Sequence, residues 1–279
     1  MSVRPVIIAA LFIATGMVSV QAADIAVRPY VKAPAAVDPA YNWTGFYIGG
    51  HAGYSWMNST DTLSPANAFA DGFFTPPPII AASLPLDPKG FIVGGQAGYN
   101  WKVSPIWVIG VEADLSWLNL EKTLSLPAPG DATRIVTAGE KLDWFGTLRG
   151  RVGVTPVDRV LVYATGGLAY GHASLSTALT RVFAGANICV LPGGGGNNCQ
   201  NGSLSETRFG WTAGGGLEWA FIGNWTLKAE YLYFDLGNIS HAMVDSRFPA
   251  VFNATAELKG NIVRAGLNYK FGGSVVAKY

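Results

Sequence analysis

Residues 45–56 read GFYIGGHAGYSW, and residues 90–101 repeat the pattern as GFIVGGQAGYNW. In both stretches apolar side chains recur at every second position, and glycine or polar residues fill most of the positions between them. A period of two is typical of a β-strand whose two faces meet different surroundings. One pair of repeats is too few for a solenoid and indicates two strands under the same packing demands.

The same alternation continues along the chain. It predicts strands over 43–56, 90–101, 107–117, 141–154, 160–174, 206–221, 225–236 and 257–271. When the apolar residues of a strand are placed on one face, the charged residues of the strand body fall on the other face. A membrane β-barrel requires this separation, because a charged side chain that faces lipid near mid-membrane costs about 2–4 kcal/mol. In 141–154 this places Leu142 outward and Lys141 inward. Strand 160–174 is apolar on both faces and has no assigned orientation.

The connections between these strands alternate in length. They have 33, 5, 23, 5, 31, 3 and 20 residues in chain order. Outer-membrane barrels join their strands by short periplasmic turns and long external loops, whereas a soluble sandwich shows no such alternation. The sequence therefore predicts an all-β fold, an eight-stranded antiparallel transmembrane β-barrel with short periplasmic turns and four long external loops. Outer-membrane lipid is its main expected partner.

Composition excludes other classes of protein. The 279 residues are 49% apolar and 13% charged, about half of the ~25% charge of soluble domains. Nineteen basic and eighteen acidic residues give a net charge of +1, which provides no positive electrostatic potential to attract a nucleic acid. No internal segment has 18 consecutive apolar residues, so helical membrane spans are excluded.

The N-terminus is typical of an exported protein. Arg4 precedes an apolar stretch over 6–20, and the small residues around Ala22 or Ala23 offer a cleavage site. The expected organisation is a signal peptide at 1–22, a Pro-rich periplasmic linker at 23–42, the barrel at 43–271 and a tail at 272–279. The expected location is the cell outer membrane of a Gram-negative bacterium.

Two features of the external loops stand out. Cys189 and Cys199 flank a glycine run, and in an exported chain such a pair predicts a structural disulfide that closes a surface loop. The first loop contains several prolines together with Phe69, Phe73 and Phe74. The expectation is a partly ordered, exposed loop; the alternatives are that it packs over the barrel mouth or presents an adhesive apolar surface.

The inward-facing charges are the most informative polar set. They are Glu112, Asp114, Arg149, Arg151, Glu218, Lys228, Glu230 and Arg264. An eight-stranded barrel is just wide enough for side chains to fill it, and buried charges there need partners. The expected role is a network of ion pairs that fills the lumen; the alternative is a pore for small solutes. Acid–base catalysis would require a substrate to enter this crowded space.

Tryptophans lie near the predicted strand ends, where aromatic residues meet the membrane interfaces. The expected girdle consists of Trp43, Trp56, Trp101, Trp107, Trp117, Trp144, Trp211, Trp219 and Trp225. No Gly-x-Ser-x-Gly elbow and no Ser/His/acid set is apparent, so no catalytic residue, metal or cofactor is expected.

Several motifs carry a family resemblance. They are NWTGFYIGGHAGY at 42–54, YATGGLAYG at 163–171, GWTAGGGLE at 210–218, AEYLYF at 229–234 and VRAGLNYKF at 263–271. In combination they resemble the alphaproteobacterial outer-membrane immunogenic proteins, a porin-family group of surface antigens with an OmpA-like eight-stranded barrel.

The resemblance carries expectations of its own. It implies that Tyr269 and Phe271 form a C-terminal signal read by the outer-membrane insertion machinery. Because the family usually ends at that phenylalanine, either the tail 272–279 is tolerated in the periplasm or Tyr279 is the terminal aromatic. Some family members bind haemin, which makes His172 and His241 candidate haem ligands.

The expected function is that of a non-catalytic surface barrel that contributes to envelope integrity and to interactions with the host or environment, including host surface ligands. The alternative is a narrow porin or a haem-binding protein that uses the loops and the lumen charges.

Overall fold

The computed structural model describes residues 41–73, 80, 83–183, 186–187, 199–245 and 248–272. The expected signal peptide, most of the linker, Cys189, Phe74 and the tail from residue 273 lie outside these residues, so the expectations that rest on them stay predictions. No helix in the described part of the chain is long and apolar enough to cross a membrane.

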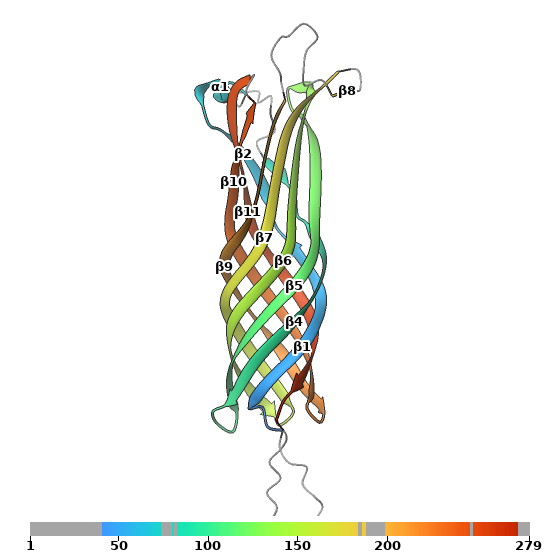
Figure 1. Cartoon of the computed structure of the whole chain (residues 1–279), viewed down its shortest axis with the longest axis vertical. Helices are drawn as coiled ribbons and strands as arrows, with labels where there is room; N and C mark the ends of the chain where they lie inside the picture. The colour runs from blue at the N-terminus through green and yellow to red at the C-terminus, as the bar shows by residue number, and fades with distance from the viewer. Residues whose placement is uncertain are drawn as a thin grey trace, which may run out of the picture. The chain divides into compact units, whose positions relative to one another are not determined.

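Eight long antiparallel strands form a closed ring (Figure 1). They are β1 (Gly45–Met57), β4 (Lys89–Lys102), β5 (Trp107–Ala128), β6 (Asp131–Val157), β7 (Val160–Phe183), β9 (Gln200–Ile222), β10 (Trp225–Asp245) and β11 (Phe248–Lys270). Each strand pairs with the next in this order, and β11 pairs with β1 from Tyr47↔Lys270 to Met57↔Gly260. This last pairing closes the sheet and confirms the predicted eight-stranded barrel.

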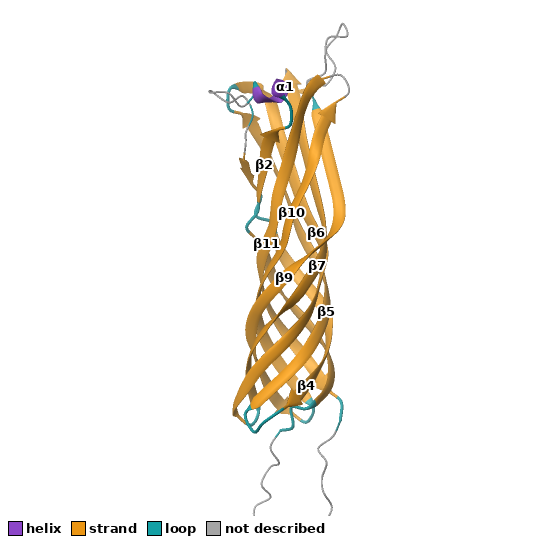
Figure 2. Cartoon of the chain, turned by 90° about the vertical axis from the view of Figure 1, so that its left-hand side faces the viewer, coloured by secondary structure: helices purple, strands orange, loops and turns teal. Residues whose placement is uncertain are grey.

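Short connections join the strands at the end that the sequence analysis assigned to the periplasm (Figure 2). Two of them have only two residues: 158–159 between β6 and β7, and 223–224 between β9 and β10. Gly223 has φ of +50°, a left-handed conformation that type I′ and II′ hairpin turns use at their first central residue and that glycine adopts without steric cost. The sequence therefore places glycine where the turn needs it.

Two rings of aromatic side chains bound the lipid-facing surface. On β1, Phe46 belongs to the lower ring and Tyr54 to the upper ring, and both are exposed. Eight residues of a strand tilted by about 40° span roughly 20 Å along the barrel axis, close to the ~25 Å apolar band of outer-membrane barrels. Residues beyond the upper ring therefore lie outside the membrane on the external side.

Strands β5, β6, β7, β9, β10 and β11 have 21 to 27 residues, against 13 and 14 in β1 and β4, and their upper parts extend beyond the end of β1 (Figure 1). β6 has 27 residues and β5 has 22, and only residues 129–130 separate them. Most of the chain expected as long loops at 118–140, 175–205 and 237–256 is therefore strand. Above the membrane, water covers the outside of the barrel, so the apolar residues face inward and the polar ones outward. Strand prediction that assumes apolar residues on the outer face therefore does not detect these upper strand segments.

A β-bulge corrects the predicted facing of two residues on β6. The β6–β7 pairing is irregular between Leu142 and Trp144. Below the bulge the odd-numbered residues Thr147, Arg149 and Arg151 are buried, and above it Leu142 is buried while Lys141 is exposed. Leu142 thus faces the lumen and Lys141 the outside, because the extra residue of a bulge exchanges the two faces of a strand.

The first external connection packs into the barrel mouth. It contains β2 (Thr60–Pro65), α1 (Ala68–Asp71) and β3 (Ser83–Pro85). β2 pairs with the upper part of β11, and Phe73 is buried against Phe252 with ring centroids 5.7 Å apart. The described part of this loop therefore packs over the mouth, which corrects the expectation of an exposed loop. A two-residue strand, β8 (Ala186–Asn187), pairs with β7.

Candidate functional site

Eight charged side chains meet in the lumen of the membrane-spanning part of the barrel. Glu112 and Asp114 come from β5, Arg149 and Arg151 from β6, Glu218 from β9, Lys228 and Glu230 from β10, and Arg264 from β11. All are buried, with exposed fractions of 5% or less. The structure therefore brings together the whole set that the sequence analysis assigned to the lumen.

Two arginines hold the centre of this network. The Nη2 atom of Arg149 lies 2.5 Å from Glu112 Oε1 and 2.9 Å from Asp114 Oδ2, and its Nη1 lies 3.1 Å from Glu230 Oε1. The Nη2 atom of Arg264 lies 2.9 Å from Asp114 Oδ2 and 2.6 Å from Glu230 Oε2. Because both guanidinium groups share Asp114 and Glu230, strands on opposite parts of the ring are tied through one cluster.

The remaining charges extend the network toward the periplasmic end. Lys228 Nζ lies 2.8 Å from Glu112 Oε1. Arg151 Nη2 lies 2.7 Å from Glu218 Oε2, and its Nη1 donates a hydrogen bond of 2.9 Å to the Tyr47 hydroxyl. That hydroxyl donates in turn to Glu112 Oε2 at 2.7 Å. Tyr47 thus joins the Arg151–Glu218 pair to the central cluster.

Tyr163 is a member of the network that the sequence analysis missed. Its hydroxyl donates to Glu230 Oε1 at 2.9 Å, and the Arg151 guanidinium lies 4.0 Å from its ring centroid. Tyr163 is on the strand that could not be oriented, since residues on both faces of 160–174 are apolar. The inward orientation of Tyr163 depends on a residue of another strand. A Cβ on Gly216 of the neighbouring β9 would lie 2.6 Å from the Tyr163 hydroxyl, so the tyrosine ring occupies the space that this glycine leaves.

Neutral donors add hydrogen bonds to two of the carboxylates, Asp114 and Glu218, while Asp114 Oδ1 has no hydrogen-bond partner. Thr147 donates to Asp114 Oδ2 at 2.6 Å, while Thr226 and Asn268 donate to Glu218 Oε1 at 2.5 and 3.0 Å. Their residue types and inward positions follow from the strand alternation, but their pairing depends on the register of strands that are distant in sequence.

The arrangement is suited to cross-bracing the barrel. Four cationic side chains face four carboxylates, and each carboxylate contacts at least one of the cations. A general base needs a free lone pair and access for substrate. These carboxylates are buried and paired, and removing one partner would leave an uncompensated charge in the lumen.

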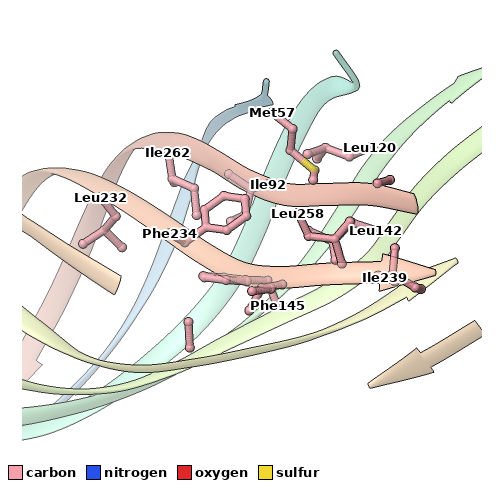
Figure 3. Close-up of a cluster of buried hydrophobic side chains, with 14 of the residues drawn as sticks. Met57, Ile92, Leu120, Leu142, Phe145, Leu232, Phe234, Ile239, Leu258 and Ile262 are labelled. Carbon is pink, nitrogen blue, oxygen red and sulfur yellow. The ribbon is translucent and has the colours of Figure 1, made fainter. Parts of the chain in front are cut away.

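Apolar clusters occupy the lumen on both sides of the charges. The middle apolar cluster lies directly above the network, and its larger members appear in Figure 3: Met57, Ile92, Leu120, Leu142, Phe145, Leu232, Phe234, Ile239, Leu258 and Ile262. The mouth cluster lies higher and includes Leu63, Phe73, Ile80, Leu84, Val136, Leu179, Met243 and Phe252. The periplasmic cluster consists of Tyr41, Trp43, Val108, Leu161, Tyr163 and Ala220.

Trp43 belongs to this periplasmic cluster and not to the aromatic girdle. It is 1% exposed, packs edge-to-face on Tyr41, and donates from Nε1 to the backbone oxygen of Asp158 at 3.1 Å. The girdle prediction is wrong for Trp43 because β1 begins only at Gly45, and the chain before it packs against the barrel end. Trp56 and Trp144 are half-buried, and the exposed tryptophans are Trp101, Trp107, Trp117, Trp211, Trp219 and Trp225.

Tyr269 and Phe271 lie in the lower aromatic ring. Tyr269 packs on Trp225 and Phe271 on Phe46, with centroid distances of 5.1 and 5.7 Å. The backbone amide of Phe271 donates to the oxygen of Phe46 at 2.8 Å, which fastens the last residues of the barrel to the first strand.

The two candidate haem ligands are not brought together. His172 lies on the outer face of β7, where its ring stacks on Trp144 at 6.2 Å and its Nε2 is 3.0 Å from Ser205 Oγ. His241 lies on β10 with its ring against Gly202, at a position level with the inward-facing Ala254. In the part of the chain that the structure describes, no group of three or more His, Cys, Asp or Glu side chains could hold a metal ion.

The third histidine forms a serine–histidine contact that the sequence did not reveal. His51 Nε2 lies 2.8 Å from Ser116 Oγ, and its Nδ1 contacts Gln96 Oε1. The same Nε2 is 3.3 Å from Arg264 Nη1. Ser116 is completely buried within the membrane-spanning lumen. The contact therefore extends the polar network, and a substrate has no approach to the hydroxyl.

Comparison with known proteins agrees with this architecture. A family model described as an outer membrane protein beta-barrel domain matches residues 9–271. The chain is 36% identical to the 31 kDa outer-membrane immunogenic protein of Brucella melitensis, over 95% of this chain and 97% of that protein. It is 29% identical to the 22 kDa outer membrane protein of Rhizobium leguminosarum, over 85% and 82% of the two chains.

Among solved structures, the outer membrane protein OprG from Pseudomonas aeruginosa is similar, with a TM-score of 0.47 and 11% identity over 83% of this chain and 98% of that one. The sequence relatives confirm the resemblance to alphaproteobacterial outer-membrane immunogenic proteins and the predicted location in the outer membrane, where lipid surrounds the barrel. The chain belongs to the outer membrane protein beta-barrel family.

Proposed function

We propose that the protein is a non-catalytic structural barrel of the outer membrane, with a closed lumen, that contributes to envelope integrity and presents its external strands to the host or environment. The observation that carries this proposal is the balanced ion-pair network between apolar clusters. Charges that neutralise one another across the lumen brace the wall, and they leave neither a free acid or base for catalysis nor a lining of one sign for ion selectivity.

Single-channel recording of the refolded protein in a planar bilayer tests the closed lumen. Heat-modifiable gel migration verifies folding before each recording. We expect no stable current steps from the wild-type barrel. Arg151→Ala/Glu218→Ala removes one ion pair without changing the net charge, and we expect brief openings from this variant if it folds. Reproducible steps from the wild type would instead support the narrow porin.

A deletion strain tests the cellular role. We expect increased sensitivity to detergent and antibiotics, with unchanged uptake of small solutes, and restoration by the wild-type gene. Normal detergent resistance together with a specific uptake defect would contradict the structural role. A haemin titration of the pure protein addresses the haem alternative. We expect haemin to cause no visible-band shift with the wild type. A shift that His172→Ala or His241→Ala removes would support the haem alternative.

We also propose that Tyr269 and Phe271 are read by the outer-membrane insertion machinery. Their support is the position in the lower aromatic ring at the end of the last strand. Phe271→Ala should slow assembly in cells while the purified variant refolds in detergent, because the signal acts during insertion. Phe46→Ala, which changes the packing partner of Phe271, is the matched control and should assemble at the wild-type rate.

A further inference from the structure

Two carboxyl groups are buried in the upper lumen, outside the membrane. Asp61 lies on β2, beyond the upper end of β1, and Glu140 lies on β6, four residues past Trp144 of the upper aromatic ring. Asp61 is 0% exposed and Glu140 is 1% exposed. The middle apolar cluster lies below them and the mouth cluster above, so both groups are enclosed by apolar side chains.

Within the described residues no ion pair compensates these two carboxyls. Lys122 on β5 is the register partner of Glu140, but its side chain is exposed and forms no ion pair with the carboxyl. Asp61 Oδ2 accepts from the Thr177 hydroxyl of β7 at 3.1 Å, and a backbone hydrogen bond from Thr255 of β11 also reaches the carboxyl. Asp61 Oδ1 and both carboxyl oxygens of Glu140 have no hydrogen-bond partner. The charged groups that act on Glu140 are Asp61 and Asp87, which are both acidic.

Burial without a cation favours the neutral form of a carboxyl, because the charged form loses its hydration. Burial raises the pKa of Glu140 to about 7; the nearby Ser59 hydroxyl opposes this shift, and the negative charges of Asp61 and Asp87 add to it. Burial raises the pKa of Asp61 to about 6, although the hydrogen bond from Thr177 opposes the shift. A protonated Glu140 also gains a donor hydrogen that can face the neighbouring Ser59 hydroxyl.

We propose that Asp61 and Glu140 form a proton-operated latch that holds β2 and β3 in the barrel mouth. The geometry links the pair directly to these strands. Asp61 is a residue of β2, and its register partners are Leu84 on β3 and Ala256 on β11. Glu140 and Thr177 belong to the barrel wall. β2 is itself paired with β11 in the sheet, so it is the Asp61 side chain that reaches across to β6 and β7. When both carboxyls are neutral, this contact stays packed; when both ionise, two negative charges without an ion-pair partner face each other across it.

The direction of the pH effect follows from linkage. A carboxyl whose pKa is raised in the packed state binds more protons there than in the open state. Its stabilising effect is complete below the ordinary carboxyl pKa, near 4, and it declines as the pH rises through about 6 and 7. The latch is therefore tight in mildly acidic surroundings and loosest above pH 8.

Amide hydrogen exchange of the refolded full-length protein tests the latch. The protein is held in lipid nanodiscs with EDTA, at pH 5.5 and pH 8.5, and rates are corrected for intrinsic exchange. We expect the protection factors of β2 and β3 amides to fall at least tenfold at pH 8.5, since each pKa unit contributes up to tenfold. Amides of the β5–β6 pairing in the membrane should keep their protection.

Substitution identifies the groups. Glu140→Gln should remove most of the pH response and keep β2 protected at pH 8.5. Asp61→Asn is the second variant should Glu140→Gln fail to show heat-modifiable folding. Asp71→Asn, an exposed carboxyl in the same connection, is the control and should respond like the wild type. An unchanged pH response in both Glu140→Gln and Asp61→Asn, or no response in the wild type, would overturn the latch. Protection at pH 8.5 that calcium restores would also overturn it, in favour of a metal site.

Discussion

Arg149 and Glu112 are direct register partners in the β5–β6 pairing, and their side chains meet inside the lumen at 2.5 Å. Cross-strand neighbours on one face of a sheet form contacts of this kind. In this barrel the pair is also the junction through which Lys228, Asp114 and Glu230 connect. One pairing in the wall thus anchors a network that reaches across the lumen.

Replacing Arg149 should destabilise the barrel strongly. Arg149→Met leaves carboxylates buried with fewer cations, and breaking a buried ion pair in this way costs about 3–5 kcal/mol. Urea unfolding in lipid vesicles measures the change in the free energy of unfolding. Lys141→Met breaks the exposed pair with Asp143 and should cost at most about 1 kcal/mol. The double variant Arg149→Met/Glu112→Gln should lose less than the sum of the single variants; strict additivity would show that the two side chains act independently.

Gly98 should not tolerate a side chain. A Cβ at this position would lie 2.4 Å from the Tyr47 hydroxyl and 2.6 Å from the backbone oxygen of Val111. Gly98→Ala must therefore displace the ring that joins Arg151 to Glu112, and overpacking of this kind costs about 1–3 kcal/mol. Gly50→Ala is the matched control, since its Cβ would have its nearest neighbour at 3.6 Å. Equal stability of the two variants would mean that the Tyr47 position is not constrained.

The sequence was sufficient to predict the barrel and its lumen charges because the membrane imposes one rule on every spanning strand. A strand in lipid must be apolar outside, so the charged residue types that remain have one available face. Arg149 and Glu218 were placed by this rule alone. The rule does not apply above the membrane, and it therefore gave no indication of the extended strands or of the burial of Glu140.

Other features depend on contacts that no local pattern encodes. The orientation of Tyr163 follows from the space beside Gly216 on another strand. The facing of Leu142 follows from a bulge whose position is set by pairing with β7. Trp43 has the residue type and the location of a girdle residue, and only the packing of Tyr41 beside it shows that it closes the periplasmic end.

The two faces of β6 allow a direct test of the membrane placement. Leu148 is exposed on the outer face between the two aromatic rings, and its neighbour Arg149 faces the lumen. Leu148→Arg should cost about 2–4 kcal/mol of unfolding free energy, because it places a charge in lipid near mid-membrane. Val157→Arg, at the end of the same strand, should cost about 0–1 kcal/mol. A cost that is equal at both positions would contradict the assigned apolar band.

Trp43 should contribute to stability from outside the strands. Trp43→Ala removes a fully buried ring and its hydrogen bond to Asp158, and losing such a ring costs about 3–5 kcal/mol. Trp101→Ala, which truncates an exposed ring of the lower girdle, is the control and should cost clearly less. Urea unfolding of both variants in the same vesicles compares them. If Trp43→Ala proved as mild as Trp101→Ala, the segment before β1 would not close the barrel, and the periplasmic cluster would have to be held by Val108, Leu161 and Ala220 alone.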